Sequence, residues 1–303
     1  MIKTTNMNLL PKAKDRISFL YIEFANIEQS GYSVVALQKN KETVIPIMTI
    51  NVLLLGPGTT VTHAAIKNIA DAGCLIVWCG RECNKFYASG MGGTYSSKNL
   101  LLQANCFSDI KSHMQVVRNM YQLRYQDKNL SHMSLEQMRG MEGKRVKELY
   151  KALSEKYRIL WNNRKYNTQE WELQDDVNKA LSIGNNFLYS IMQGIIMSMG
   201  FSPAIGFIHT GRMLSFVYDI ADIYKEKITI PIAFEVVGTH QYEDLDKHIR
   251  KMCKEKIQEI HLMKLLPKDL KFIFDISKYD FDIPSEFMLW DLNSDVFSGI
   301  NYG

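Results

Sequence analysis

The apolar residues of the first ninety positions cluster in short, strand-like runs, which predict a β-rich N-terminal domain. Short runs rich in aromatic and β-branched side chains are separated by turn residues such as Gly31 and the segment 56–58. One helix is predicted over residues 62–72, with Thr62 as its cap and Gly73 as its stop. The expected strands are residues 16–24, 32–37, 43–48, 52–55, 74–78 and 85–88.

From about residue 110 onward, the apolar residues recur instead at helical spacing. One stripe consists of Ile110, Met114, Val117 and Tyr121, which follow one another at intervals of three or four. Comparable patterns predict further helices over residues 134–157, 177–195 and 245–260. The second half of the chain is therefore expected to be helical.

A glycine- and serine-rich stretch separates the two patterns and is typical of a linker. Its glycines lack the spacing of a phosphate-binding loop. We therefore predict an α+β, multidomain chain. A β-sandwich-like domain at 1–89 and a linker at 90–98 would precede a larger, all-α catalytic domain at 99–303.

Composition and charge narrow the class of protein. The chain has 303 residues, of which 46% are apolar and 22% charged, as in an ordinary globular protein. Its net charge of +4 hides an asymmetry, because residues 111–165 hold 13 Lys or Arg against 5 Asp or Glu. Such a local excess indicates a surface that binds a polyanion, although a solvated helix face would show the same pattern.

The cysteines and the first residues of the chain predict a reduced, cytoplasmic protein. Residues 1–17 are polar and mixed, without the apolar core of a secretory signal. Cys74, Cys79 and Cys83 lack the paired spacing of a zinc site. The most apolar run, 187–201, is short and interrupted by polar residues, so we expect a buried core helix and no membrane association.

Four polar residues carry the clearest chemical signal: Glu142, His209, Asp219 and Asp222. The two aspartates lie three apart in a segment with helical character, and would therefore share one helix face. A histidine at the entry to that helix could join them around one divalent cation, and the basic neighbours favour a phosphate-bearing substrate. Taken singly, these residues have ordinary explanations as a core histidine and as helix charges facing solvent.

Glu142 has an unusual local context for a helical residue. Gly140 and Gly143 bracket it, and each glycine costs about 1 kcal/mol relative to alanine within a helix. Glycines are expected there if a ligand or another backbone must approach closely. A surface ion pair of Glu142 with Arg145 is the ordinary alternative.

Three longer motifs carry a resemblance to a known family. They are RGMEG at 139–143, AIGFIHTG at 204–211 and FVYDIAD at 216–222. With them the chain resembles the CRISPR-associated protein Cas1, most closely in its I-E subtype, from residue 10 to about residue 253. The resemblance implies a metal-dependent integrase that inserts short DNA fragments (protospacers) into the repeat of a CRISPR array by transesterification.

The resemblance also implies the cofactor, the ligands and the partners. Glu142, His209 and Asp222 would hold Mg²⁺ or Mn²⁺, and Asp219 would be a supporting catalytic carboxylate. The substrates would be double-stranded DNA, as protospacer and as repeat with its leader. Such proteins act as two homodimers bridged by a small ferredoxin-like partner, the second Cas protein, in a larger heterocomplex.

A set of aromatic and basic residues is expected to contact nucleic acid, either by position in the family or as neighbours of the site. Two departures from the family pattern are Thr60, in place of an arginine, and Phe24, in place of a tyrosine. The expected contacts are Phe24, Lys67, Lys85, Arg139, Arg145, Tyr166, Trp171, Tyr189, Arg212, Tyr218, Lys225 and Arg250.

Two other functions remain open from the sequence. The same metal site would serve a structure-selective nuclease for branched DNA, because water can replace the attacking hydroxyl. A non-catalytic DNA-binding scaffold is the third reading. The intact glutamate, histidine and aspartate set argues against the scaffold, which would have no need of metal ligands.

Overall fold

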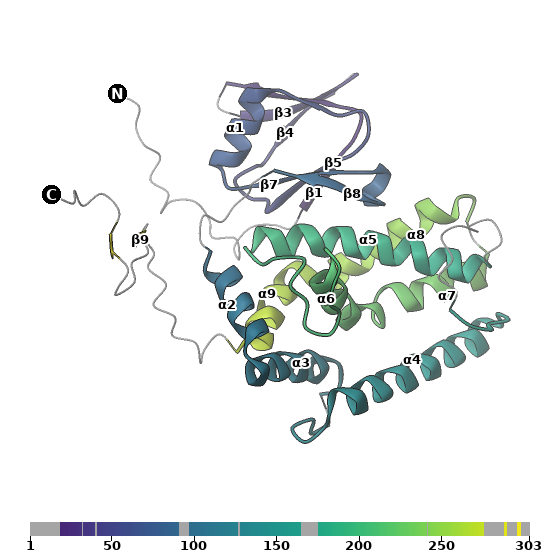
Figure 1. Cartoon of the computed structure of the whole chain (residues 1–303). Helices are drawn as coiled ribbons and strands as arrows, with labels where there is room; N and C mark the ends of the chain where they lie inside the picture. Colours follow the sequence, from purple (N-terminus) through teal and green to yellow (C-terminus); the bar gives the residue numbers. More distant parts are fainter. Residues whose placement is uncertain are drawn as a thin grey trace.

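The computed structural model describes residues 19–275, apart from 32, 40, 91–96, 127, 165–174 and 241, together with the strand residues 288–289 and 296–297. A β-rich region with two sheets precedes a helical domain, which confirms the predicted fold class (Figure 1). Most of the proposed linker lies outside the described residues, so the domain boundaries stay a prediction.

Two four-stranded sheets form the N-terminal region. In the first sheet β1, β5 and β7 run parallel and β8 is antiparallel to β7. In the second sheet the hairpin partners β2, β3 and β4 are antiparallel, and β6 joins β2 in parallel. The strand orders are β1 (Phe19–Ile22), β5 (Val52–Leu55), β7 (Leu75–Cys79), β8 (Phe86–Ser89), and β4 (Lys41–Ile45), β3 (Ser33–Gln38), β2 (Asn26–Ser30), β6 (Thr60–Val61).

The central strand β5 is buried on both faces. Leu53 and Leu55 point into a core shared with the second sheet and α1 (His63–Asp71). Val52 and Leu54, on the opposite face, belong to the core of the helical domain. Because side chains alternate along a strand, one apolar run joins both cores and fixes the sheet against the helices.

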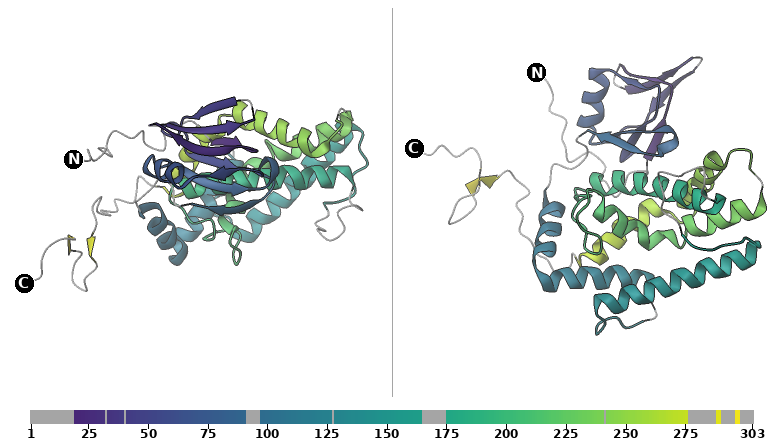
Figure 2. Two further views of the ribbon diagram at one scale, coloured as in Figure 1. Left: turned by 90° about the horizontal axis from the view of Figure 1, so that it is seen from above. Right: turned by 45° about the vertical axis from the view of Figure 1, so that its right-hand side comes forward.

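Helix α5 is the centre of the helical domain and lies directly beneath the first sheet (Figures 1 and 2). Its sequence is apolar on most sides, and most of its residues are buried, as predicted for the run 187–201. The helices are α2 (Lys98–Ser108), α3 (Ile110–Arg124), α4 (Leu135–Tyr157), α5 (Asp176–Ser198), α6 (Ser215–Lys225), α7 (Thr229–Thr239), α8 (Leu245–Glu259) and α9 (Leu262–Ile273).

Helix α4 lies on the side of the helical domain remote from the sheets (Figures 1 and 2). Ser134 caps it through a reciprocal box: its hydroxyl oxygen accepts from the backbone N–H of Gln137, and the side-chain oxygen of Gln137 accepts from the backbone N–H of Ser134. Within the described residues, no helix has the length and apolar character needed to cross a bilayer. The two-residue strands β9 (Met288–Leu289) and β10 (Val296–Phe297) pair with each other.

Arg250 of α8 connects the helical domain to the β-rich region. Only 6% of the residue is exposed. Its Nη1 donates a hydrogen bond of 2.6 Å to the carbonyl oxygen of Arg81, in the 3₁₀ turn η3 (Arg81–Cys83), and its Nη2 pairs with Asp246. The guanidinium of Arg250 is thus buried and bonded within the protein, and its expected contact with DNA stays a prediction.

Replacing Arg250 by methionine is expected to lower the free energy of unfolding by about 2 kcal/mol, because the Arg81 carbonyl loses a buried donor. Chemical denaturation measures this loss. The matched control is Lys251→Met, since Lys251 is exposed on the same helix, and its effect should stay within about 0.5 kcal/mol. Equal effects of the two substitutions would contradict the structural role of Arg250.

Candidate active site

Asp219 is the buried anchor of the candidate site. It lies on α6 with 1% of the residue exposed. Its two carboxylate oxygens accept hydrogen bonds from three successive backbone N–H groups, those of Phe207 (2.6 Å), Ile208 (3.1 Å) and His209 (2.8 Å). The loop between α5 and α6 is therefore folded around this one side chain, and its path places His209 beside α6.

The same carboxylate also orients the imidazole ring of His209. Nδ1 of His209 lies 2.8 Å from Oδ1 of Asp219. This hydrogen bond raises the pKa of His209, against the effect of partial burial, and the charge of Asp222 raises it further. With a proton on Nδ1, the neutral ring presents Nε2 as its lone-pair atom, which is how a carboxylate prepares a histidine for a metal ion.

Asp222 lies one turn further along α6, and its ion-pair partner is a lysine. Its Oδ1 is 2.5 Å from Nζ of Lys225. The two groups form a close ion pair, so the ammonium of Lys225 occupies this buried oxygen. Burial alone would lower the pKa of Lys225, but the carboxylate of Asp222 raises it. The lysine is therefore a resident counter-charge for Asp222.

Glu142 reaches the site from α4 and is held by two groups of α3. Its Oε2 accepts a hydrogen bond of 2.8 Å from the hydroxyl of Tyr121, and its Oε1 pairs with Nη1 of Arg124. Burial, and then the carboxylate of Glu142, raise the pKa of Tyr121, which keeps this phenol protonated as a donor. The second amino group of Arg124 binds Glu226 at 2.7 Å.

A small cavity of about 10 Å³ brings three of the four predicted residues together. That volume accommodates one water-sized group. The fourth residue, His209, is attached to the cavity wall through Asp219. The lining residues are Met120, Tyr121, Arg124, Glu142, Ile208, Asp219, Asp222 and Ile223.

The donor set fits a divalent cation in chemistry, while its present geometry favours internal ion pairs. Two carboxylates and an imidazole suit Mg²⁺ or Mn²⁺. Among the described residues, no three histidine, cysteine, aspartate or glutamate side chains lie close enough to hold one ion. Arg124 and Lys225 compensate the charge of Glu142 and Asp222 instead.

The two glycines beside Glu142 face open space. A Cβ added at Gly140 or at Gly143 would meet no other described atom within 4 Å. The expected close approach of another backbone is therefore absent from the described residues. Space for a bound ligand remains on this side of α4.

The residues expected to contact nucleic acid divide into three groups. Lys67, Lys85, Arg139, Arg145 and Arg212 are exposed, as is Phe24, whose ring lies over Gly58. Tyr166 and Trp171 lie outside the described residues.

Apart from Arg250, the remaining members, Tyr189, Tyr218 and Lys225, cluster beside the site. The rings of Tyr189 and Tyr218 meet edge to face with centroids 4.9 Å apart, and Lys225 lies 4.8 Å from the centroid of Tyr189. Tyr218 is in turn 6.0 Å from the ring of His209, measured between centroids. These aromatic rings therefore line the approach to His209 and Asp222.

Three residues of the site were not predicted as members. Tyr121 was assigned only to the apolar stripe of α3, and Arg124 and Glu226 were assigned no role. One signal was available, because Glu226 follows Asp219 and Asp222 at intervals of seven and four, and therefore shares their helix face. No comparable spacing connects Arg124 to Glu142, since the two lie on different helices.

Comparison with known proteins decides the family. Residues 113–256, which include the whole candidate site, match the family model described as CRISPR associated protein Cas1. A CRISPR-associated endonuclease Cas1 of Thermus thermophilus is 38% identical over 305 residues, covering 98% of this chain and 94% of that protein. The chain belongs to the Cas1 family. The prediction of a Cas1 endonuclease and integrase of CRISPR adaptation is thereby confirmed.

Two further Cas1 proteins extend the likeness across most of the chain. The Cas1 of Escherichia coli is 38% identical over 263 residues, which are 86% of each protein. A crystal structure of a TtCas1–DNA complex is similar at a TM-score of 0.75 with 40% identity, covering 88% of this chain and 99% of that one. The likeness to the solved TtCas1 structure therefore extends over the β-rich region and the helical region.

Proposed function

We propose that this Cas1 protein joins the 3′-hydroxyl ends of short DNA fragments to the repeat of a CRISPR array, and that the joining depends on a divalent cation. The observation that carries the proposal is the single cavity lined by Glu142, Asp219 and Asp222, with His209 fixed at its wall. The reaction is a transesterification in which the hydroxyl oxygen attacks phosphorus and the repeat strand leaves as a 3′-hydroxyl. With water as nucleophile, the same residues cut DNA.

Glu142, His209 and Asp222 are the proposed ligands of Mg²⁺ or Mn²⁺. A bound cation of this type neutralises charge on the phosphoryl oxygens and orients the attacking or departing oxygen. The place of Asp222 at the cavity wall and the ring orientation of His209 support the assignment. One imidazole among the oxygen ligands favours Mn²⁺ over Mg²⁺.

Asp219 acts through its neighbours in this proposal. Its oxygens are already engaged by three backbone N–H groups and by the ring of His209, so little capacity remains for a cation. It keeps the tautomer and the direction of His209, and it holds the loop that carries this histidine. Asp219 is therefore a positioning residue, and the expectation of a supporting catalytic carboxylate is kept in that sense.

DNA is the proposed substrate, and the positive surface supports its binding. The basic stretch 111–165 includes α4, where Lys147 and Lys151 line an open groove of about 640 Å³ that begins at Glu142. Tyr150 and Trp161 line the same groove, as stacking platforms for nucleic acid commonly do. A solved relative described as TtCas1 was crystallised with DNA.

The wider assembly is proposed from the family resemblance. It comprises homodimers of this chain, bridged by a small ferredoxin-like second Cas protein into a larger complex that holds the protospacer and the repeat. We also keep the I-E subtype as a proposal, because the three motifs around Glu142, His209 and Asp219 support it. Both points are separable from the chemistry of the site.

One assay separates integration from the alternatives. It combines the protein and its small partner with a short duplex bearing 3′-hydroxyl ends, a supercoiled repeat plasmid and Mn²⁺. Joined product is the expected result. Cutting without joining would instead favour a structure-selective nuclease, and binding without either product would favour a scaffold.

A further inference from the structure

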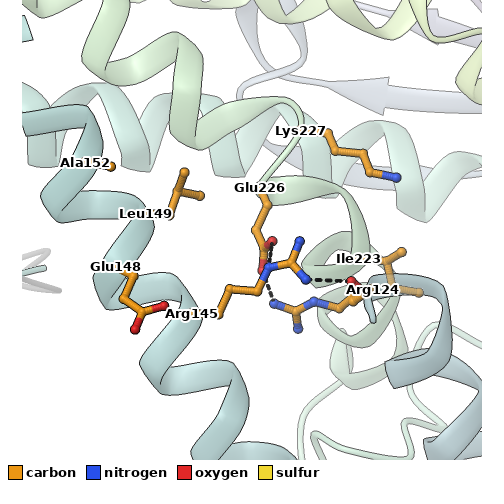
Figure 3. Close-up of a pocket in the computed structure, with 8 residues that line it drawn as sticks. All are labelled: Arg124, Arg145, Glu148, Leu149, Ala152, Ile223, Glu226 and Lys227. Carbon is orange, nitrogen blue, oxygen red and sulfur yellow. Dashed lines mark hydrogen bonds and ion pairs between the residues drawn. The ribbon is translucent and has the colours of Figure 1, made fainter. Parts of the chain in front are cut away.

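Glu226, at the C-terminal end of α6, pairs with two arginines, and one of them, Arg124, lines the active-site cavity. Its carboxylate is 2.7 Å from Nη2 of Arg124 and 2.8 Å from Nε of Arg145, and its side chain is 10% exposed. Figure 3 shows the two guanidinium groups meeting at this carboxylate, in a pocket of about 420 Å³ beside α4. Glu226 is not among the residues to which the family resemblance assigns a role, although its largely buried side chain makes two ion pairs.

Arg124 forms ion pairs with two carboxylates. It binds Glu142 through Nη1 and Glu226 through Nη2, and only 6% of its side chain is exposed. Its Nε has no hydrogen-bond partner within the described part of the chain. A buried guanidinium that already lacks one partner is strongly destabilised if it loses its carboxylates. Glu142 can therefore turn away from Arg124 only if another acid stays in place.

We propose that Glu226 is a positioning residue. It keeps its ion pair with Arg124 when Glu142 turns to a divalent cation, and it thereby sets the affinity of the site for the cation. The inference rests on the proposed role of Glu142 as a ligand. Without Glu226, Arg124 would have Glu142 as its one carboxylate among the described contacts. The cation would then have to break a buried and unshared ion pair.

The test is Glu226→Gln, read out by direct binding of Mn²⁺ to the full-length protein without DNA. The fraction of free Mn²⁺ is measured by electron paramagnetic resonance. We expect binding about tenfold weaker than in the wild type, or about 1.4 kcal/mol. Strand transfer should recover to near the wild-type rate at saturating Mn²⁺, so the Mn²⁺ requirement changes while the maximal rate does not.

Glu148→Gln is the matched control. Glu148 lines the same pocket on α4 and carries the same charge, but it is 65% exposed and contacts Lys144 in place of Arg124. Its substitution should leave Mn²⁺ binding within twofold of the wild type. Equal weakening in both variants, or none in Glu226→Gln, would overturn the proposal.

A second pair of variants serves if Glu226→Gln does not fold. In Arg145→Gln the carboxylate of Glu226 pairs with Arg124 alone. Arg124 then depends less on Glu142, so Mn²⁺ should bind more tightly. The control for the lost positive charge is Lys144→Gln, which is exposed on the same helix. No difference between these two variants rejects the proposal.

The underlying ligand assignment has its own control. Glu142→Gln should weaken Mn²⁺ binding. Unchanged binding in that variant would reject the ligand set of the proposed function. Weakened binding in Glu142→Gln together with normal binding in Glu226→Gln would reject only the role of Glu226.

Discussion

Glu142→Gln is expected to reduce strand transfer and DNA cutting on the order of a thousandfold, because the substitution removes a ligand charge where phosphoryl charge develops. The amide keeps the size of the side chain and one oxygen that accepts from Tyr121 or Arg124. The free energy of unfolding should therefore change by no more than about 1 kcal/mol. Gel analysis of joined product and urea denaturation measure the two quantities.

The control for this prediction lies further along the same helix. Glu155 is exposed and pairs with Lys151 at the solvent-facing end of α4. Glu155→Gln should keep strand transfer within twofold, because an exposed pair contributes little to stability and lies outside the cavity. If Glu142→Gln retained activity in the presence of Mn²⁺, the assignment of Glu142 to the reaction would fail.

Helical periodicity allowed several helices of the second half of the chain to be predicted closely, whereas α2, α7 and α9 were not predicted individually. The stretch 134–157 was expected as one helix, and α4 extends over Leu135–Tyr157. Its apolar spacing, its capping serine and its C-terminal break are all local features, so the sequence contains them. The stripe that begins at Ile110 likewise became α3.

The strands were predicted less accurately for a conformational reason. Residues 16–24 were expected as one strand, whereas β1 covers Phe19–Ile22 and a separate strand, β2, covers Asn26–Ser30. Phe24 interrupts the run because its φ is +52°, a left-handed value that strand residues do not adopt. Aromatic and branched residues favour strands by type, and they do not reveal such a corner.

The site was predictable in its membership and unpredictable in its ion pairs. The motif positions named Glu142 and Asp222, and the structure places both at one cavity. Their partners, Arg124 and Lys225, depend on which helix faces meet, and that is decided by packing of distant segments. Arg250 illustrates the limit, because a buried arginine and an exposed one are identical in sequence.

Asp219→Asn is expected to lower the free energy of unfolding by about 3 kcal/mol or more. The amide of asparagine would point its own N–H donors at the backbone N–H groups of residues 207–209, which are donors too. Part of this loop would therefore lose its buried acceptor. Strand transfer should fall as well, since His209 would lose its orientation. Urea denaturation of the cation-free protein isolates the structural part of this effect.

Asp222→Asn is the comparison that gives this prediction its meaning, because Asp222 loses one ion pair with Lys225 and no backbone contact. Its loss of stability should be the smaller of the two.

The pH dependence adds a second check. The hydrogen bond to Asp219 raises the pKa of His209 in the folded chain, so the stability from this pair is complete below about pH 6.5, the unfolded value, and is lost as the pH rises through the folded pKa. The stability difference between wild type and Asp219→Asn should therefore shrink with rising pH, and a constant difference would show that His209 does not take part in the network.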